Sequence, residues 1–304
     1  MSQGSRSCHQ RTRTEQQTSQ GASIGNWRVV ELLAEGPWSR VYRARPQGAG
    51  DPSASDYAVK VARPPDARGD QQGVAAALIR REAHVGRAVA HRHLTSILSS
   101  HVAEAPHYVV MPYLEGATLE EALEAVTAVP LAHGLWILRQ TAQAVQALHR
   151  AGWLHSDIKP DNIFVSPNGH VTLLDLGLAR RIDRAECAPD APFAGTLAYA
   201  APESFSTIDG TGPASDIYSL GITLFRTLTG ALPFAGDEPE ELAEAHLHRT
   251  PPDPRRFNPT LPGRVVRLLR RMLAKQPERR PAAAELIAWL ADLEIDVFDD
   301  RCVA

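Results

Sequence analysis

Residues 155–162 read His-Ser-Asp-Ile-Lys-Pro-Asp-Asn, and residues 175–177, beyond a predicted hairpin, read Asp-Leu-Gly. The first stretch places a carboxylate, an amine and an amide close together, and the second adds another carboxylate. These four side chains are Asp157, Lys159, Asn162 and Asp175. Magnesium prefers oxygen ligands of this kind and usually shares them with the phosphates of a substrate. We therefore expect one site that supplies both a base and the ligands of a hard cation.

The chain before this site has the pattern of a β-sheet with one helix. Short runs rich in β-branched and aromatic residues are typical of strands. Such runs occur at 27–33, 40–44 and 57–61, and two more follow the predicted helix, the second of them at 108–111. A helical stretch at 72–90 separates the third run from the last. The front of the chain is therefore predicted to be β-rich.

After Gly116 the pattern becomes helical. Apolar residues recur at spacings of three and four from Leu131 to Leu148, which predicts one buried helix face, and Gly152 ends that helix. Turn residues at 167–169 predict a hairpin between two short strands. Further helices are predicted at 216–230, 238–248, 262–274 and 281–293.

The composition excludes several classes of protein. With 304 residues, 43% of them hydrophobic, the chain is neither a disulfide-stapled mini-protein nor wholly disordered. Its net charge of −3 argues against a dedicated nucleic-acid binder. The chain has three cysteines without CxxC spacing, which indicates a reduced compartment. It contains no apolar run of the length or position that a membrane span or a signal peptide would need. We therefore expect a cytoplasmic enzyme without nucleic-acid or membrane partners.

The catalytic stretch, together with Gly-Thr at 195–196 and Ala-Pro-Glu at 201–203, resembles the eukaryotic-like (Hanks-type) serine/threonine protein kinase family in its bacterial, soluble form. The resemblance implies an α+β fold of two lobes. One is a small β-rich N-lobe with one main helix, and the other is a larger, mainly helical C-lobe. The implied segments are a disordered tail at 1–25, an N-lobe at 26–111, a hinge at 112–116, a C-lobe at 117–294 and a C-terminal tail at 295–304.

The same resemblance assigns roles to the four side chains of the site. It implies that Asp157 accepts the proton of the substrate hydroxyl and that Lys159 compensates the charge of the γ-phosphate of ATP. Asn162 and Asp175 match the ligands of Mg²⁺, for which Mn²⁺ is an alternative. Isolated residues of these types are common in turns and caps, but the ordered string favours the catalytic interpretation.

The resemblance also implies an ATP site built largely from the front of the chain. Lys60, in Tyr-Ala-Val-Lys at 57–60, matches the lysine that contacts the α- and β-phosphates, and Glu82 is its expected partner. The glycine-rich loop is reduced to Ala34-Glu35-Gly36-Pro37, and we expect the lost glycines and the proline to stiffen it. The residues implied to bind nucleotide here are Ala34, Gly36, Val41, Ala58, Met111, Leu114 and Phe164.

Four further residues match scaffold positions of the family. Thr196 is expected to hydrogen-bond the catalytic aspartate and lysine. Asp216 is expected to accept hydrogen bonds from backbone N–H groups of the catalytic loop. Arg280 is expected to form an ion pair with Glu203, and breaking such a buried pair costs about 3–5 kcal/mol.

One departure from the family bears on regulation. Most members have arginine directly before the catalytic aspartate, where it receives a phosphate from the activation segment, and this chain has Ser156 there. Between Asp175 and Glu203 the only hydroxyl side chains are those of Thr196 and Tyr199. Both of these lie at the docking end of the segment, so the arginine that would bind the phosphate and the usual sites of phosphorylation are missing together. We expect activity that does not require activation-loop phosphorylation.

The sequence therefore predicts ATP-dependent phosphorylation of serine or threonine on a protein substrate, with two alternatives left open. A pseudokinase scaffold would bind nucleotide without transferring phosphate, which the reduced glycine loop and Ser156 would allow. A small-molecule phosphotransferase of the same fold would share the catalytic residues. That second alternative fits poorly with Lys159, Thr196 and the Ala-Pro-Glu motif, which organise a surface for protein substrates.

Overall fold

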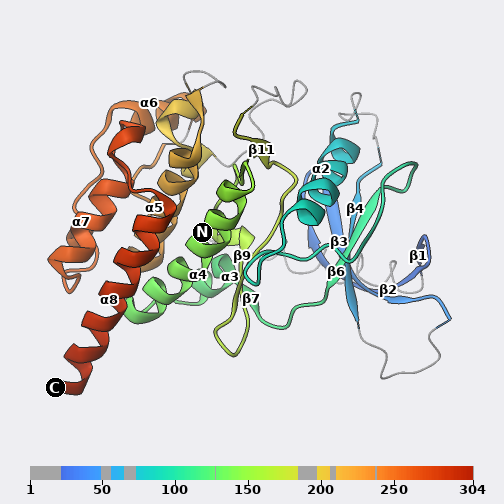
Figure 1. Ribbon diagram of the computed structural model, residues 1–304, viewed down its shortest axis with the longest axis horizontal. Coiled ribbons are helices and arrows are strands. Elements are labelled where there is room, and N and C mark those ends of the chain that lie inside the picture. The colour runs from blue at the N-terminus through green and yellow to red at the C-terminus, as the bar shows by residue number, and fades with distance from the viewer. Residues whose placement is uncertain are drawn as a thin grey trace, which may run out of the picture. The chain divides into compact units, whose positions relative to one another are not determined.

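The computed structural model describes most of the chain as two compact units (Figure 1). The first unit comprises the described residues up to Arg87 together with Ser96–Leu114. The second comprises Ala88–Thr95 and the described residues from Glu115 onward. The described residues are 22–48, 56–64, 73–126, 128–183, 197–205, 210–236 and 238–303.

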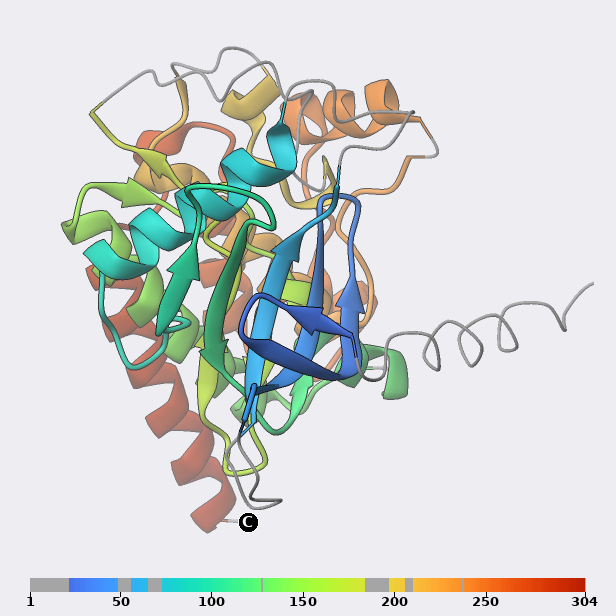
Figure 2. The ribbon, with the colours of Figure 1, turned by 90° about the vertical axis from the view of Figure 1, so that its right-hand side faces the viewer.

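The first unit is built on an antiparallel sheet of six strands in the order β1-β2-β3-β4-β6-β5. Figure 2 shows these strands side by side in blue to green. Apart from the short β1, they follow the β-like runs of the sequence. Their bounds are Ser23–Ile24 (β1), Trp27–Glu35 (β2), Ser39–Pro46 (β3), Tyr57–Ala62 (β4), Ser99–His101 (β5) and Tyr108–Pro112 (β6).

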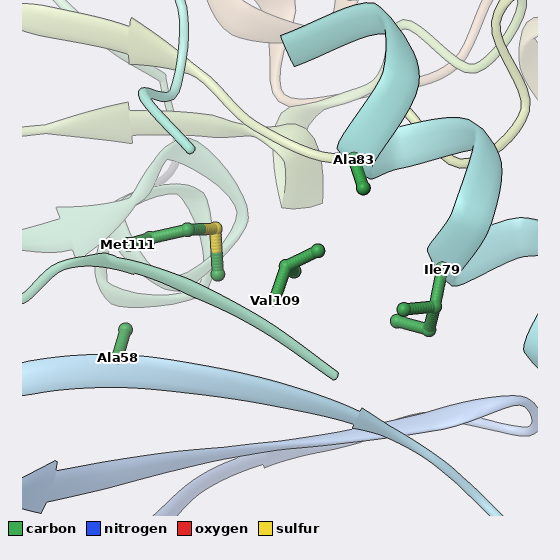
Figure 3. Packing of buried hydrophobic residues seen from close by; sticks show 5 residues of the cluster. All are labelled: Ala58, Ile79, Ala83, Val109 and Met111. Carbon is green, nitrogen blue, oxygen red and sulfur yellow. The ribbon is translucent and has the colours of Figure 1, made fainter. Parts of the chain in front are cut away.

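One helix, α2 (Val74–Ala88), packs against one face of this sheet. Its apolar residues point toward the sheet and form a cluster with strands β4 and β6 (Figure 3). The buried members of the cluster are Ala58, Ile79, Ala83, Val109 and Met111. Because side chains alternate along a strand, Val59 packs in a second cluster on the opposite face, and Lys60 returns to the face of Ala58.

The sheet begins before the expected start of the domain. Ile24 pairs with Trp27 across a tight turn, so the tail expected at 1–25 is wrong at its end. Gly25 makes this turn possible, because its φ is +55° and an added Cβ would lie 2.5 Å from the hydroxyl of Tyr108. A strand of two residues has no pattern that the sequence could have revealed. Residues 1–21 lie outside the described part of the chain.

The border between the units falls between Leu114 and Glu115, within the hinge expected at 112–116. The segment Ala88–Thr95 was expected in the N-lobe but belongs to the second unit. The reason is backbone pairing with Leu173, whose N–H donates to the carbonyl of His93 at 2.8 Å and whose carbonyl accepts from Thr95 at 3.0 Å. Backbone pairing of a short connecting segment with a distant strand leaves no pattern in the sequence.

The second unit is mainly helical. The long helices α4 and α5 form its centre, and the buried face of α5 includes Tyr218 and Phe225. The α-helices of this unit are α3 (Leu119–Ala125), α4 (Leu131–Arg150), α5 (Pro213–Thr229), α6 (Pro239–His248), α7 (Gly263–Met272) and α8 (Ala283–Val303). The 3₁₀ turns are η1 (Pro160–Asn162), η2 (Leu197–Tyr199), η3 (Pro202–Phe205), η5 (Pro254–Arg256) and η6 (Pro277–Arg279).

Helix α8 continues well beyond the predicted helix 281–293, so the C-terminal tail expected at 295–304 is helical as far as Val303. The helix packs along α4 (Figure 1), where Arg139 contacts Glu294 at 2.7 Å. Arg264 forms a further ion pair with Asp296. These pairs extend the helix past its last buried leucine. None of the helices in the described part of the chain combines the length and apolar character that a bilayer crossing requires.

The described part of the second unit also contains five short strands, and the segment 155–162 lies between two of them. One small sheet has the order β10-β9-β7, and β8 pairs with β11 in another. Gly169, with φ of +79°, closes the hairpin between β9 and β10, as the turn residues predict. The bounds are Ala117–Thr118 (β7), Trp153–Leu154 (β8), Ile163–Val165 (β9), Val171–Leu173 (β10) and Arg180–Arg181 (β11).

A buried histidine lies near the end of α6. The ring of His246 is fully buried, shares a hydrogen bond of 3.0 Å with the hydroxyl of Tyr218 and lies 5.0 Å from the ring of Phe234. Lys275 Nζ donates to the carbonyl oxygens of Ala245 at 3.2 Å and His246 at 2.6 Å. Burial, followed by the positive charge of Lys275, lowers the pKa of His246 to about 4.

We expect the free energy of unfolding to fall as the pH drops from 6.5 toward about 4. In that window the unfolded chain binds a proton at His246 that the folded chain does not, and a shift of this size corresponds to about 3 kcal/mol. Urea unfolding at about pH 7 and about pH 5 measures the loss. His246→Gln should flatten the pH dependence, whereas His248→Gln, an exposed neighbour, should leave it unchanged. Equal pH dependence in wild type and His246→Gln would contradict the assignment.

Candidate active site

The loop between β8 and β9 gathers three of the predicted catalytic side chains. Lys159 Nζ lies 2.9 Å from Asp157 Oδ2, and Asn162 Nδ2 donates to the same oxygen at 2.9 Å and to the Asp157 carbonyl at 2.7 Å. The side chain of Asp157 is only 9% exposed. Asp157 is therefore a nearly buried carboxylate held between a cation and an amide. Such a group is positioned to accept a proton from a bound hydroxyl.

Asp216 fixes the bend that precedes Asp157. It is buried on α5 and accepts hydrogen bonds from the backbone N–H of His155 at 2.9 Å and of Ser156 at 3.0 Å. Ser156 has a φ of +68°, which L residues rarely adopt, so these bonds hold a strained backbone. Burial raises the pKa of Asp216, but the hydrogen bond and charge of His149 outweigh it, and the net pKa is lowered. Asp216 is thus an anion beneath the loop.

Leu174 connects the β8–β9 loop to Asp175 through backbone hydrogen bonds. The backbone N–H of Asp157 donates to His155 Nδ1 at 3.3 Å, so the proton of the neutral ring is on Nε2 and is donated to the Leu174 carbonyl at 3.0 Å. The N–H of Leu174 in turn donates to the carbonyl of Asn162 at 2.8 Å. Both backbone groups of Leu174 are therefore used by the catalytic loop. The next residue, Asp175, is placed beside that loop as a consequence.

The donor set at this place fits a magnesium ion shared with phosphates. Asp175 has a φ of +61°, and its Oδ1 accepts the N–H of Gly177 at 3.1 Å, which orients the carboxylate. Asn162 adds an amide oxygen, since its Nδ2 is bound to Asp157. Within the described ranges, no three acidic, histidine or cysteine side chains gather as a metal site of their own. One carboxylate and one amide suit Mg²⁺, which usually completes its ligands with phosphates and water.

Lys60 and Glu82 meet inside the first unit. Their Nζ and Oε2 atoms lie 2.8 Å apart, with the side chains 10% and 1% exposed. Glu82 lies on the same face of α2 as Ile79 and Ala83, which pack on the sheet. Burying two charged side chains costs them much of their hydration, so an ion pair of this kind need not stabilise the fold. We therefore interpret the pair as a device that fixes the position of the Lys60 amine.

The other predicted nucleotide residues are distributed over both units. Val41 packs against the cluster that contains Ala58 and Met111, and these two face each other across β4 and β6 (Figure 3). Leu114 is the last residue of the first unit. Phe164 lies in β9 of the second unit. The structure therefore brings together Val41, Ala58 and Met111, within the first unit.

The reduced glycine loop is the hairpin turn between β2 and β3. Ala34 pairs with Val41 in the β2–β3 register, and the N–H of Gly36 donates to the carbonyl of Ser39 at 2.9 Å. Arg63 contacts this turn from the end of β4. Its guanidinium lies 3.0 Å from Glu35 and donates to the Gly36 carbonyl at 3.2 Å. Sequence reasoning gave Arg63 no role.

Glu203 and Arg280 form the pair that the sequence implies. Arg280 donates to the two carboxylate oxygens at 2.6 and 2.8 Å, and its side chain is fully buried. Ser215 adds a hydroxyl donor to Glu203 at 2.6 Å. Burial raises the pKa of Glu203, but the bond and charge of Arg280 outweigh it and lower the pKa overall. Thr196, which was expected to contact the catalytic loop, lies outside the described residues.

Sequence reasoning missed His149. This residue ends the buried face of α4, and its Nε2 lies 2.8 Å from Asp216 Oδ2. A histidine in the last turn of a helix can also interact favourably with the negative end of the helix dipole. The position of His149 in the sequence therefore does not by itself reveal its contact with Asp216. The available signal was a polar residue directly after the last buried position, Leu148.

The comparisons with known proteins agree with this geometry. The family model "Protein kinase domain" matches residues 27–289. A probable serine/threonine-protein kinase, pknA2, of Bifidobacterium longum is 31% identical over 88% of this chain and 35% of its own length. Serine/threonine-protein kinase PknA of Mycobacterium tuberculosis is 38% identical over 57% of this chain and 39% of its own. PrkC of Bacillus subtilis, also named a serine/threonine-protein kinase, is 33% identical over 72% and 33%. The chain thus spans 33–39% of the length of each of these relatives.

Proposed function

Because the chain belongs to the protein kinase family, we propose that it transfers the γ-phosphoryl group of ATP to serine or threonine hydroxyls of protein substrates. Its β-rich first unit and mainly helical second unit are the two lobes of the α+β kinase fold. The observation that carries the proposal is the convergence of Lys159 and Asn162 on Asp157. The serine/threonine-protein kinases named above support the choice of substrate class.

In the proposed reaction the substrate oxygen forms a bond to the γ-phosphorus while the bond from that phosphorus to the bridging oxygen of ADP breaks. Asp157 orients the hydroxyl and receives its proton, and Lys159 balances the negative charge beside it. Lys60, held by Glu82, contacts the α- and β-phosphates. When bound, Mg²⁺ or Mn²⁺ would neutralise phosphate charge, and Asn162 and Asp175 are the residues that would hold it.

The remaining nucleotide contacts follow from the first unit and from β9. Val41, Ala58 and Met111 of the first unit are the proposed apolar contacts of adenine, and Phe164 of the second unit is a further proposed contact. The backbone N–H of Leu114 is the proposed hydrogen-bond donor to the base. The β2–β3 turn, with Ala34 and Gly36, covers the phosphates. Transfer from ATP requires a compartment that contains it, and we propose the cytoplasm.

We further propose that activity does not depend on phosphorylation of the activation segment. Ser156 replaces the arginine that would receive the phosphate. The hydroxyl of Tyr199 is bound by Arg226 at 2.5 Å, its ring is 5% exposed and its carbonyl accepts from Ser219 at 2.8 Å. The end of the segment is therefore held by contacts that need no phosphate.

Phosphatase treatment is expected to leave the rate of protein phosphorylation unchanged within about twofold, because Ser156 stands in place of the arginine that would bind such a phosphate. The measurement compares treated and untreated enzyme, with mass spectrometry of residues 178–199 in both. A mock-treated sample is the control. A phosphate in that segment whose removal silences the enzyme would contradict the proposal.

Incubation with labelled ATP and Mg²⁺, with and without a generic basic protein acceptor, tests the function itself. Label on the protein acceptor supports the proposal, provided that an Asp157 variant gives none. Nucleotide binding without any transfer would instead indicate a pseudokinase scaffold. Label that appears only on small molecules in a metabolite mixture would indicate a small-molecule phosphotransferase.

A further inference from the structure

The turn between β2 and β3 is held by side chains rather than left free. Glu35, which precedes Gly36, lies 2.8 Å from Arg40 and 3.0 Å from Arg63. Arg63 also binds the turn twice through the backbone, because its guanidinium donates to the Gly36 carbonyl at 3.2 Å and its N–H donates to the Trp38 carbonyl at 2.9 Å. We call this set of contacts among Glu35, Gly36, Trp38, Arg40 and Arg63 the turn clasp.

The turn itself does not require glycine in this conformation. A Cβ added to Gly36 would meet only the Ser39 carbonyl, at an ordinary contact distance of 3.7 Å, and Gly36 has no positive φ. Pro37 fixes its own φ and has no N–H to donate. The conformation of the turn therefore depends on the contacts of its neighbours, and Arg63, which directly follows β4, contacts Glu35, Gly36 and Trp38.

We infer that Arg63 is a positioning residue that holds the β2–β3 turn in one conformation and thereby slows the release of nucleotide. The inference rests on the proposed function, which places the phosphates under this turn. Arg63 acts in two ways. It restrains the turn through Gly36 and Trp38, and it balances the charge of Glu35, which would otherwise repel a triphosphate.

The effect of the clasp should be moderate and sensitive to salt. The side chains of Glu35, Arg40 and Arg63 are 35%, 39% and 35% exposed, so water and ions screen their attraction. Losing the ion pair and the bond to the Gly36 carbonyl should speed nucleotide release roughly threefold to tenfold. The difference between wild type and variant should shrink as the ionic strength rises.

The experiment compares wild type with Arg63→Ala, Arg63→Lys and Glu35→Gln, and uses Arg28→Ala, an exposed arginine on the same sheet, as the matched control. Hydrogen exchange of the peptide spanning 34–41 is measured without nucleotide. Stopped-flow release of a fluorescent ATP analogue is measured with Mg²⁺. Arg63→Ala should exchange faster at Gly36 and release the analogue faster. Arg63→Lys should fall between wild type and Arg63→Ala.

Each outcome decides one question. Unchanged exchange and release in Arg63→Ala, with normal analogue binding by wild type, would overturn the clasp but leave the proposed function standing. Failure of wild type to bind the analogue would overturn the proposed function, while exchange at Gly36 still reports on the clasp. Equal acceleration in Arg28→Ala would show a general effect of lost positive charge and would also overturn the inference.

Discussion

Asp157→Ala is expected to lower the rate of phosphoryl transfer by about 10²–10⁴-fold while the affinity for ATP changes by less than about threefold. The Asp157 carboxylate is 2.9 Å from both Lys159 Nζ and Asn162 Nδ2, and in the proposed reaction it contacts the substrate hydroxyl rather than the nucleotide. Its loss should therefore raise the energy of the transition state and leave the nucleotide complex almost unaffected. Steady-state kinetics with labelled ATP separate kcat from KM.

Two variants make that prediction sharper. Asp157→Asn preserves the size of the side chain and the contact with Lys159, so a similar loss there assigns the effect to the missing base. Asp161→Ala removes an exposed carboxylate from the same loop and should keep nearly full activity.

Asp175→Ala is expected to affect nucleotide binding rather than the transfer step, because its carboxylate is one of the two proposed side-chain ligands of Mg²⁺. Binding of the nucleotide in the presence of Mg²⁺ should weaken at least about tenfold, whereas binding without the metal should change little. Calorimetric titration with and without Mg²⁺ measures both. Mild, equal effects of Asp157→Ala and Asp175→Ala on all parameters would contradict the two assigned roles.

The catalytic loop could be read from the sequence because its functional side chains lie within one short segment. Asp157, Lys159 and Asn162 contact one another directly, so their spacing already contains most of the geometry. Glu82 was harder, since only its distance along the chain suggested it. The structure places it opposite Lys60 because it shares a helix face with Ile79. An acidic residue within an apolar face is a signal that can be sought in other sequences.

The contacts that the sequence could not reveal are those made by common residues across long separations. Arg63 reads as an ordinary arginine after a strand, and its role depends on a turn more than twenty positions earlier. The extension of α8 depends on Glu294, whose partner Arg139 is 155 positions away. No local propensity encodes such pairs, because tertiary packing alone brings the partners within reach.

Arg280→Ala is expected to lower the free energy of unfolding by about 3–5 kcal/mol. Arg280 is fully buried and donates to both oxygens of Glu203 and to the carbonyl oxygens of Ala214, Ala274 and Lys275. Its removal leaves the nearly buried Glu203 carboxylate without its cation and takes a charged donor from three carbonyl oxygens, and each such loss is costly. Urea unfolding at neutral pH measures the change.

The double variant Glu203→Gln/Arg280→Met separates the net contribution of the ion pair to the free energy of unfolding from the penalty of leaving one charge without its partner. Because it removes both charges, it should lose less stability than the two single changes added together, by roughly 1–3 kcal/mol. Arg279→Ala is the matched control, because Arg279 is an exposed arginine directly before Arg280. It should change the free energy of unfolding by less than about 0.5 kcal/mol. Strict additivity of the two single losses would mean that Glu203 and Arg280 do not depend on each other, although they lie 2.6 Å apart. In that case the damage in Arg280→Ala would come from the lost bonds to the carbonyl oxygens of Ala214, Ala274 and Lys275, and the pair itself would contribute little to the stability of the fold.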